Sequence, residues 1–249
     1  MGALRARDLA RMALSAELLQ TTWNYERQQG IGWAWSLEPE LDRLIADERR
    51  RLDRLADHIG YFNTQPTLAS LLLGAVARLE EGRAAGEDGD PATVARIKTV
   101  LGASLASIGD RLFWFTLRPF AACLGIALTL MGLPWGALAM WVSYNVVHQG
   151  IRFLGVGWGY REGPAVAGGA LRARLERLTW VLCLGGATLV GIVVAGLMVP
   201  GGQPRPVGFQ LLLATGLALG LLSAQRPRPS PTEWALALAG LALVVAWRP

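Results

Sequence analysis

The sequence contains few of the residues from which catalytic and metal sites are usually built. Its 249 residues include two histidines and two cysteines. His58 and His148 have no metal-ligand spacing between them, and Cys123 and Cys183 each stand alone in an apolar run. We therefore predict no catalytic residue, no metal site and no cofactor, and we interpret both cysteines as packing residues. An enzyme is disfavoured for the same reason, since no nucleophile or acid–base set is visible.

Charge is also scarce, and lysine is almost absent. Only 17% of the residues are charged, 52% are hydrophobic and the mean hydropathy is +0.33, which is too apolar for an average soluble domain. Lys98 is conspicuous as the only lysine among 24 basic residues. The net charge of +5 comes with no aromatic–basic motif of a nucleic-acid-binding protein, so nucleic acid is not an expected partner.

Acidic and basic residues are missing from two long runs near the C-terminus, 178–200 and 207–224. At ~1.5 Å per residue, about 20 apolar residues in a helix cross the hydrocarbon core of a bilayer, so both runs are predicted to span the membrane. A third run, 234–247, is shorter and would span only with tilt, local thinning of the bilayer or protein neighbours. The sequence therefore predicts an integral membrane protein.

Other apolar stretches are interrupted. The stretch 112–153 contains Arg118-Pro119 and Gly132-Leu133-Pro134, which predicts two helices that meet in a tight turn near Pro134. The runs 66–77 and 101–109 are too short to cross a bilayer alone. They fit re-entrant hairpins or buried helix pieces, which membranes tolerate only where protein or a water-filled cavity satisfies the backbone.

The N-terminal part carries many of the charges. Residues 1–20 lack the uninterrupted apolar run of a cleavable signal and predict an amphipathic helix on the cytoplasmic membrane surface or on a partner. A solvent-exposed soluble helix is the alternative. Residues 38–58 predict one charged helix with a solvated face, and residues 80–91 a cytoplasmic loop.

Arginines predict the orientation in the membrane. Four of them precede the 178–200 run, whereas only Arg205 separates it from the next run, so the N-terminus is expected inside and the C-terminus outside. The four are Arg161, Arg172, Arg174 and Arg177. We divide the chain into interfacial and charged helices at 1–60, membrane segments with the polar motifs at 61–160, a basic cytoplasmic segment at 161–177 and membrane helices at 178–249.

Four polar segments stand out against the apolar sequence, and the first runs from Trp23 to Gln28. On a helix, Gln20, Asn24 and Gln28 would form one polar stripe, with Arg27 beside it and Trp23 on its flank. Amide donors and acceptors next to an aromatic ring are what a neutral sugar with many hydroxyls requires. The alternative is that these amides satisfy backbone groups at helix breaks.

The other three segments are Tyr61-Phe62-Asn63-Thr64-Gln65-Pro66, Ile97-Lys98, and Gly109-Asp110-Arg111-Leu112-Phe113-Trp114 continuing to Leu117-Arg118-Pro119. Residues before a proline leave helical geometry, so amides gather ahead of Pro66. Lys98 and Asp110 are expected either to neutralise each other across a break or to bond a sugar. Asp110, Trp114 and Arg118 are predicted to share a helix face, where an Asp110–Arg118 ion pair is the structural alternative to substrate contact.

Together these segments resemble the IID component of the mannose/fructose/sorbose family of bacterial phosphotransferase sugar transporters. That family typically reads S-W-N-Y-E-R-M-Q-G-L-G, then F-F-N-T-Q-P or F-F-N-T-N-P, then I-K and a G-P-L-A-G-x-G-D-x-x-F-W-x-x-x-R-P block. Order and approximate spacing match from about Leu19 to about Gly163. One phrase alone can arise by chance, whereas four in order are specific.

The resemblance implies an all-helical subunit of an elevator-type permease, with several transmembrane helices and re-entrant hairpins, in the bacterial cytoplasmic (inner) membrane. It implies a IIC-like membrane partner, in an oligomer of IIC–IID pairs, and a hexose-type sugar that the phospho-IIB part of a cytoplasmic IIAB component phosphorylates. No phosphorylated residue is expected in this chain. Of the polar residues, the expected sugar contacts are Asn24, Gln28, Asn63, Lys98 and Asp110. The expected supporting residues are Trp23, Glu26, Arg27, Gln65, Trp114 and Arg118.

The chain departs from the family pattern in three places. Residues 102–107 read Gly-Ala-Ser-Leu-Ala-Ser where the family has a Gly-Pro-Leu-Ala-Gly block, Arg111 replaces a small residue, and Gln29 stands next to Gln28 where the family wording differs. The alternative function is therefore a IID-derived membrane scaffold or regulatory subunit that does not transport.

Overall fold

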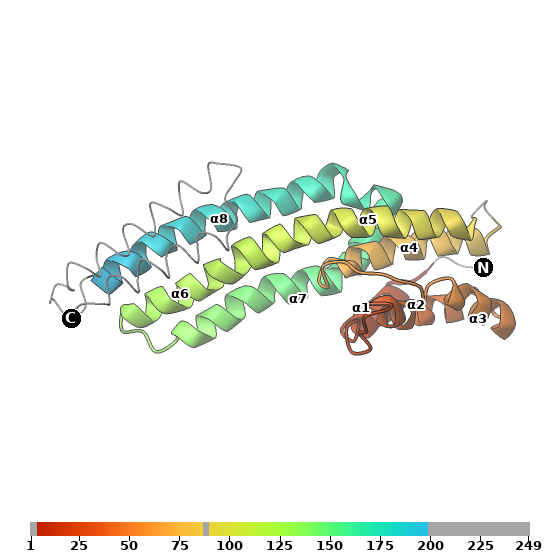
Figure 1. Ribbon diagram of the computed structural model, residues 1–249, viewed down its shortest axis with the longest axis horizontal. Coiled ribbons are helices and arrows are strands. Elements are labelled where there is room, and N and C mark those ends of the chain that lie inside the picture. Colours follow the sequence, from red (N-terminus) through yellow and green to blue (C-terminus); the bar gives the residue numbers. More distant parts are fainter. Residues whose placement is uncertain (1–3, 87–89, 199–249) are drawn as a thin grey trace, which may run out of the picture.

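Helices make up all the regular secondary structure in the part of the chain that the computed structural model describes, residues 4–86 and 90–198 (Figure 1). This confirms the all-helical prediction for these residues. The expected runs 207–224 and 234–247 lie outside them. In chain order the elements are α1 (Ala6–Ala16), α2 (Gly30–Leu44), α3 (Glu48–Ala56), α4 (Ala69–Ala84), α5 (Pro91–Leu112), η1 (Phe113–Leu117), α6 (Arg118–Leu130), α7 (Gly136–Glu162), η2 (Gly163–Ala167) and α8 (Gly169–Met198).

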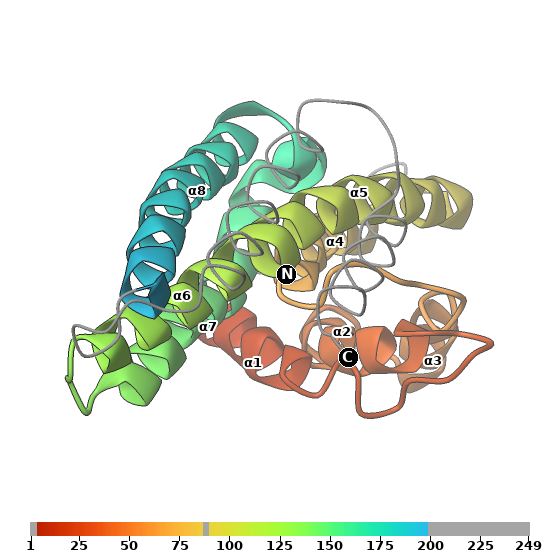
Figure 2. The ribbon, with the colours of Figure 1, turned by 60° about the vertical axis from the view of Figure 1, so that its left-hand side comes forward.

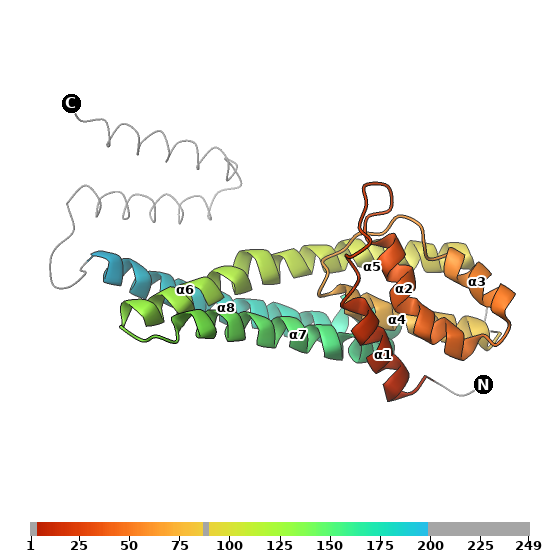
Figure 3. The same ribbon diagram turned by 90° about the horizontal axis from the view of Figure 1, so that it is seen from below.

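The long helices run side by side along the molecule. Helices α5, η1 and α6 follow one another as one long rod, and α7 and α8 pack along α6 (Figure 1). The short helices α1, α2 and α3 gather beside α4 at the other end, away from the α6–α7 turn (Figures 2 and 3). The molecule therefore has an apolar rod of long helices and a more charged end formed by α1 to α4.

The core lies where α4 meets its neighbours. Most of the N-terminal part of α4 is buried, and Trp33 of α2, Phe113 of η1 and Leu72 of α4 are among the large side chains with almost no exposed surface. Helix α7 approaches α4 so closely that a Cβ added to Gly159 would lie 1.8 Å from the carbonyl oxygen of Leu71. Small residues at such crossings let helix backbones touch, as in membrane helix pairs.

Large apolar side chains remain exposed on the long helices and on the turn between α6 and α7. They include Leu130, Trp135, Trp141 and Trp180 on α6, α7, α8 and the turn between them. A soluble protein rarely exposes so many, and such surfaces contact lipid or another protein. Two helical stretches, Pro91–Leu130 and Gly169–Val194, are long and apolar enough to cross a membrane. The second overlaps the span predicted at 178–200.

Several local predictions can be compared with the helices. The tight turn near Pro134 is confirmed, because α6 ends at Leu130 and α7 begins at Gly136. Residues 101–109 lie inside α5, which continues through η1 into α6, so no break separates Lys98 from Asp110. The run contains no proline, and its two serines and two glycines lie within the helix without ending it.

The N-terminal helices also differ in detail from the prediction. A helix forms at Ala6–Ala16, but it packs on α2 and α7 of the same chain. The single helix expected at 38–58 is wrong. Helix α2 ends at Leu44, and α3 starts anew at Glu48 because the Asp47 side chain accepts a hydrogen bond from the Arg50 N–H at 2.8 Å and caps it.

Candidate functional site

The first polar segment folds as a compact loop between α1 and α2. Gln28 N–H donates to the Asn24 carbonyl oxygen at 2.8 Å, and the Asn24 side-chain oxygen accepts from the N–H groups of Glu26 at 3.1 Å and Arg27 at 2.8 Å. The helical stripe of Gln20, Asn24 and Gln28 is therefore a wrong prediction. The asparagine side chain satisfies the backbone locally and competes with a helix, the usual behaviour of Asn before a turn.

Gln28 reverses the chain at the end of this loop. Its φ of +52° is left-handed, the only such value for a non-glycine residue in the described part of the chain. Its side-chain amide donates to the Tyr25 carbonyl oxygen at 3.3 Å, and its backbone pairs with that of Phe62. The loop is thereby brought against the second polar segment.

Gln29 locks the two segments together. Its buried side-chain amide donates to the Thr64 carbonyl oxygen at 2.8 Å and accepts from the Thr64 N–H at 3.0 Å. Its backbone N–H donates to the Phe62 carbonyl oxygen at 2.8 Å. The side chain thus pairs with the extended segment as a neighbouring β-strand would.

Helix α5 closes the other side of the second segment. The Thr64 hydroxyl donates to the Gly102 carbonyl oxygen at 2.8 Å. One face of α5 touches Gln65 so closely that a Cβ added to Gly109 would lie 2.6 Å from the Gln65 Cβ. Three of the polar segments, more than 80 residues apart at their extremes, therefore meet in one place.

Gln65 is buried and shapes the start of α4. Its side-chain oxygen accepts from the Leu68 N–H at 2.8 Å, and its amide nitrogen lies 3.3 Å from the Thr67 hydroxyl. Capping of this kind satisfies backbone donors at a helix start. Gln65 thus supports the start of α4, and its expected role beside a bound sugar stays a prediction.

Lys98 lies beneath the junction and is almost completely buried. Its ammonium group donates to the His58 carbonyl oxygen at 3.0 Å and lies 5.3 Å and 5.2 Å from the ring centres of Trp33 and Phe62. Such ring faces attract cations. A pairing of Lys98 with Asp110 is wrong, because both residues lie on continuous α5, about 18 Å apart along its axis at ~1.5 Å per residue.

Asp110 and Arg118 flank an irregular turn. Residues Phe113–Leu117 form a π-helix, where the Thr116 hydroxyl donates to the Arg111 carbonyl oxygen at 2.9 Å. This turn does not keep the regular four-residue spacing expected for Asp110, Trp114 and Arg118. Arg118 lies over the Trp114 ring at 5.0 Å, and among the described residues no ion pair joins it to Asp110. Single π-helical turns are frequent at functional sites.

The surface of the junction carries polar groups from several segments. Asn63 and Asp110 are exposed, and Asn24 and Gln28 are partly exposed. In the loop, Trp23 packs edge-on against Tyr25 at 5.0 Å, and Arg27 lies 3.9 Å from Glu26. The expected sugar contacts thus divide into a surface group of Asn24, Gln28, Asn63 and Asp110, and the buried Lys98.

The residues that hold the junction together were missed from the sequence. Gln29, Thr64 and Trp33 carry its main buried contacts. A signal was present for Gln29: aligned on the glycines at 30 and 32, it takes the place of the glutamine in the family phrase, and Gln28 takes the place of the methionine. Gln29 therefore matches the family glutamine, and the prediction that Gln29 departs from the pattern is wrong by one residue in register.

A buried charge cluster surrounds the side chain of His58, the residue whose backbone carbonyl accepts from Lys98. Burial opposes ionisation of Glu80, but hydrogen bonds from His58 at 3.3 Å, Arg54 at 2.7 Å and Arg83 at 2.5 Å hold its pKa at about 2. Burial, followed by the negative charges of Glu80 and Glu81, raises the pKa of Glu40 well above its ordinary value. Both Glu40 carboxyl oxygens are buried without a hydrogen-bond partner among the described residues. Burial and the neighbouring carboxylates therefore favour the protonated form of Glu40 beside an ionised Glu80.

The comparisons with known proteins agree on one group of relatives. Residues 3–201 match the profile described as the phosphotransferase system mannose/fructose/sorbose family IID component. The mannose-specific EIID component of Escherichia coli K12 is 34% identical over 77% of this chain and 66% of its own length. The sorbose-specific EIID component of Klebsiella pneumoniae is 29% identical over 95% of this chain and 94% of its own length.

Solved structures resemble the fold over nearly the whole chain. A chain from the cryo-EM structure of the mannose transporter ManYZ with microcin E492 matches with a TM-score of 0.62 and 27% identity. The match covers 99% of this chain and 96% of that one. A second structure, of a membrane protein, matches with a TM-score of 0.73 and 28% identity, over 98% of this chain and 97% of that one.

Proposed function

The chain belongs to the mannose/fructose/sorbose family of IID components of the phosphotransferase system, and on this premise we propose that it is the membrane-embedded IID subunit of a sugar permease. It binds a hexose-type sugar together with a IIC-like subunit. Phospho-IIB of the cytoplasmic IIAB component then phosphorylates the sugar on the cytoplasmic side. The chain contributes contacts and geometry and carries no covalent intermediate.

One observation supports this proposal: the three segments that carry Asn24, Gln28, Asn63 and Asp110 meet at one junction, where all four residues keep some exposure. Amide side chains both donate and accept hydrogen bonds, and a carboxylate accepts from two hydroxyls, which suits a neutral polyol. The exposed ring of Trp23 offers an apolar face for a sugar ring. Groups that together recognise one solute need this proximity.

Lys98 is proposed to hold the segment that carries Asn63 in place. Its bond to the His58 carbonyl and its place between Trp33 and Phe62 fix the segment that continues into Asn63. A buried cation with no carboxylate within 4.0 Å among the described residues depends on this carbonyl and these rings. Its loss would displace Asn63 from the sugar.

The proposed movement is a rigid-body displacement of the elevator type, with η1 as the bend in the long α5–α6 rod. Its π-helical turn already departs from regular helix geometry next to Asp110. The exposed apolar side chains of the rod contact lipid and the IIC-like subunit, in an oligomer of IIC–IID pairs. The N-terminus is cytoplasmic and the C-terminus lies outside.

Reconstitution with IIC and IIAB, followed by phosphoenolpyruvate-dependent uptake of candidate hexoses, tests the proposal. Asp110→Asn and Lys98→Ala are expected to abolish uptake while the protein stays in the membrane. Val100→Ala, at an exposed apolar position of α5, is the control and should retain wild-type uptake. Wild-type rates in both polar variants would exclude these residues from the mechanism. An inactive wild-type chain that still assembles with IIC would favour the non-transporting scaffold, which the altered 102–107 block motivates.

A further inference from the structure

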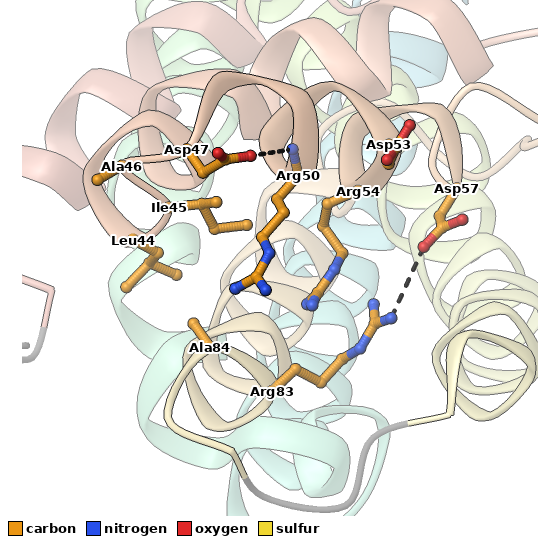
Figure 4. Close-up of a pocket in the computed structure, with 10 residues that line it drawn as sticks. All are labelled: Leu44, Ile45, Ala46, Asp47, Arg50, Asp53, Arg54, Asp57, Arg83 and Ala84. Atoms are coloured by element: carbon orange, nitrogen blue, oxygen red, sulfur yellow. Dashed lines mark hydrogen bonds and ion pairs between the residues drawn. The ribbon is translucent and has the colours of Figure 1, made fainter.

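A cavity of about 620 Å³ lies between α3 and the C-terminal end of α4, and none of the expected sugar contacts lines it (Figure 4). This volume falls in the ~300–1,000 Å³ range of small-molecule sites. Three arginines line the cavity, Arg50, Arg54 and Arg83, together with the carboxylates of Asp47, Asp53 and Asp57. The cavity thus combines several guanidinium groups with acceptor oxygens at its border.

Two of these arginines are fixed in the cavity wall. Arg54 and Arg83 reach the two oxygens of the buried Glu80 carboxylate at 2.7 Å and 2.5 Å, and Arg83 lies 3.6 Å from Asp57. Their positions are therefore set by the fold before any ligand arrives. Preorganised charges of this kind cost little ordering on binding.

Arg50 differs from these two arginines, because its guanidinium group forms no ion pair with the described residues. It lies one helical turn before Arg54, and its side chain points toward Arg54 and Ala84 across the cavity (Figure 4). Only its backbone N–H bonds Asp47, and among the described residues no carboxylate lies within 4.0 Å of its guanidinium group. A planar guanidinium in this state is suited to bind a phosphate through two parallel hydrogen bonds.

We propose that this cavity binds the phosphate monoester of a sugar-sized polyol, an inference that rests on the proposed function because this is the chemical class of the permease product. Arg50 binds the phosphate, while Arg54 and Arg83, whose charges are balanced by Glu80 and Asp57, form the wall of the cavity. The carboxylates of Asp53 and Asp57 accept hydrogen bonds from hydroxyl groups. The cavity is lined by residues of α3, of the segment before it and of the C-terminal end of α4. Helix α3 lies at the end of the molecule opposite the α6–α7 turn (Figure 1).

Calorimetric titration tests the proposal with the full-length chain, purified in detergent with any subunits that accompany it. The probes are glucose 6-phosphate, glucose and inorganic phosphate. The wild-type chain is expected to bind glucose 6-phosphate saturably, and at least tenfold more tightly than either of the other two. Absence of saturable binding up to about 10 mM, or equal affinity for inorganic phosphate, overturns the proposal.

Adjacent arginines supply a matched pair of variants. Arg50→Gln should weaken glucose 6-phosphate binding about tenfold or more, as expected for loss of a charge-assisted bond. Arg49→Gln removes the same charge from a neighbouring exposed residue outside the cavity lining and should change the affinity less than twofold. Arg50 forms no ion pair with the described residues, so the variant should fold, which its melting temperature verifies. Equal effects of the two substitutions would contradict the assignment.

Two further measurements distinguish a sugar-phosphate site from a lipid-headgroup site and from a defect in transport. Added phosphatidylglycerol should not compete with glucose 6-phosphate, and competition would identify a lipid-headgroup site instead. Sugar uptake at low product concentration should be unchanged in Arg50→Gln. Failure of the proposed function would appear as absent wild-type uptake, whereas failure of this inference would appear only in the binding titration.

Discussion

The side-chain amide of Gln29 holds the backbone of Thr64 by two hydrogen bonds, donating to its carbonyl oxygen at 2.8 Å and accepting from its N–H at 3.0 Å. Because Thr64 in turn bonds Gly102 of α5, this contact fixes the loop before α2 relative to the long rod. The neighbouring polar surface of Asn24 and Asn63 depends on it. A buried amide thus fixes the segments that carry the proposed sugar contacts.

Replacement of Gln29 by leucine should destabilise the protein more than any change in the exposed part of the loop. Two buried backbone groups of Thr64 would lose their partners, each at a cost of ~1–3 kcal/mol, so we expect the free energy of unfolding to fall by about 2–6 kcal/mol. Gln28→Leu, at a partly exposed position, is the control. Equal melting temperatures of the two variants in the same detergent would contradict the assignment.

Gly109 should tolerate no side chain. A Cβ there would lie 2.6 Å from the Gln65 Cβ, so Gly109→Ala should push α5 away from the second polar segment at a cost of about 1–3 kcal/mol. Gly157→Ala is the matched control, because nothing lies within 4 Å of a Cβ at this helical position. Thermal unfolding should separate the two alanine variants, and a Gly109→Ala protein as stable as Gly157→Ala would exclude the tight packing.

Glu40 should make the protein less stable as pH rises. Its pKa in the folded protein is raised by burial and by Glu80 and Glu81, so above the ordinary value of 4.5 the folded state retains a proton that the unfolded state loses. Stability then falls by up to about 1.4 kcal/mol per pH unit until the raised pKa is reached. Glu40→Gln removes this titration, so its melting temperature should exceed that of the wild type by a margin that grows as pH rises above 4.5 toward the raised pKa.

Glu80 should show the opposite pH dependence. Its pKa of about 2 is lowered, so the stability from its bonds to His58, Arg54 and Arg83 is present above 4.5 and is lost as pH falls toward 2. Glu80→Gln should be less stable than the wild type at neutral pH, and the difference should narrow in acid. A constant difference across this range would show that the ionised form is not what the arginines stabilise.

The helices could be predicted from the sequence wherever hydrophobicity determined them. The apolar run 178–200 and the turn near Pro134 correspond to α8 and to the α6–α7 junction because long uncharged runs and Gly-Pro breaks have few alternatives. The loop at 23–28 could not be predicted, since its amides fit a helical stripe as well as a turn. Tertiary bonds of Gln29 to Thr64 decided between the two.

The candidate site was predicted as a set of residues but not as an arrangement. Asn24, Asn63 and Asp110 were identified by their polarity among apolar neighbours, and all three keep some exposure at the junction. Lys98 was selected by the same rule, yet its long side chain reaches inward to His58. Polarity in the sequence does not distinguish a group that faces a ligand from one that satisfies a buried carbonyl.

Equilibrium binding of a radiolabelled hexose to the purified chain with its IIC partner tests the central claim most directly. Asn63→Ala should raise the dissociation constant about tenfold or more, as loss of hydrogen bonds to a bound hydroxyl predicts, while the melting temperature stays within about 2 °C of the wild type because Asn63 is exposed. An unchanged dissociation constant in Asn63→Ala and in Asp110→Asn would contradict the claim that these exposed groups bind the sugar.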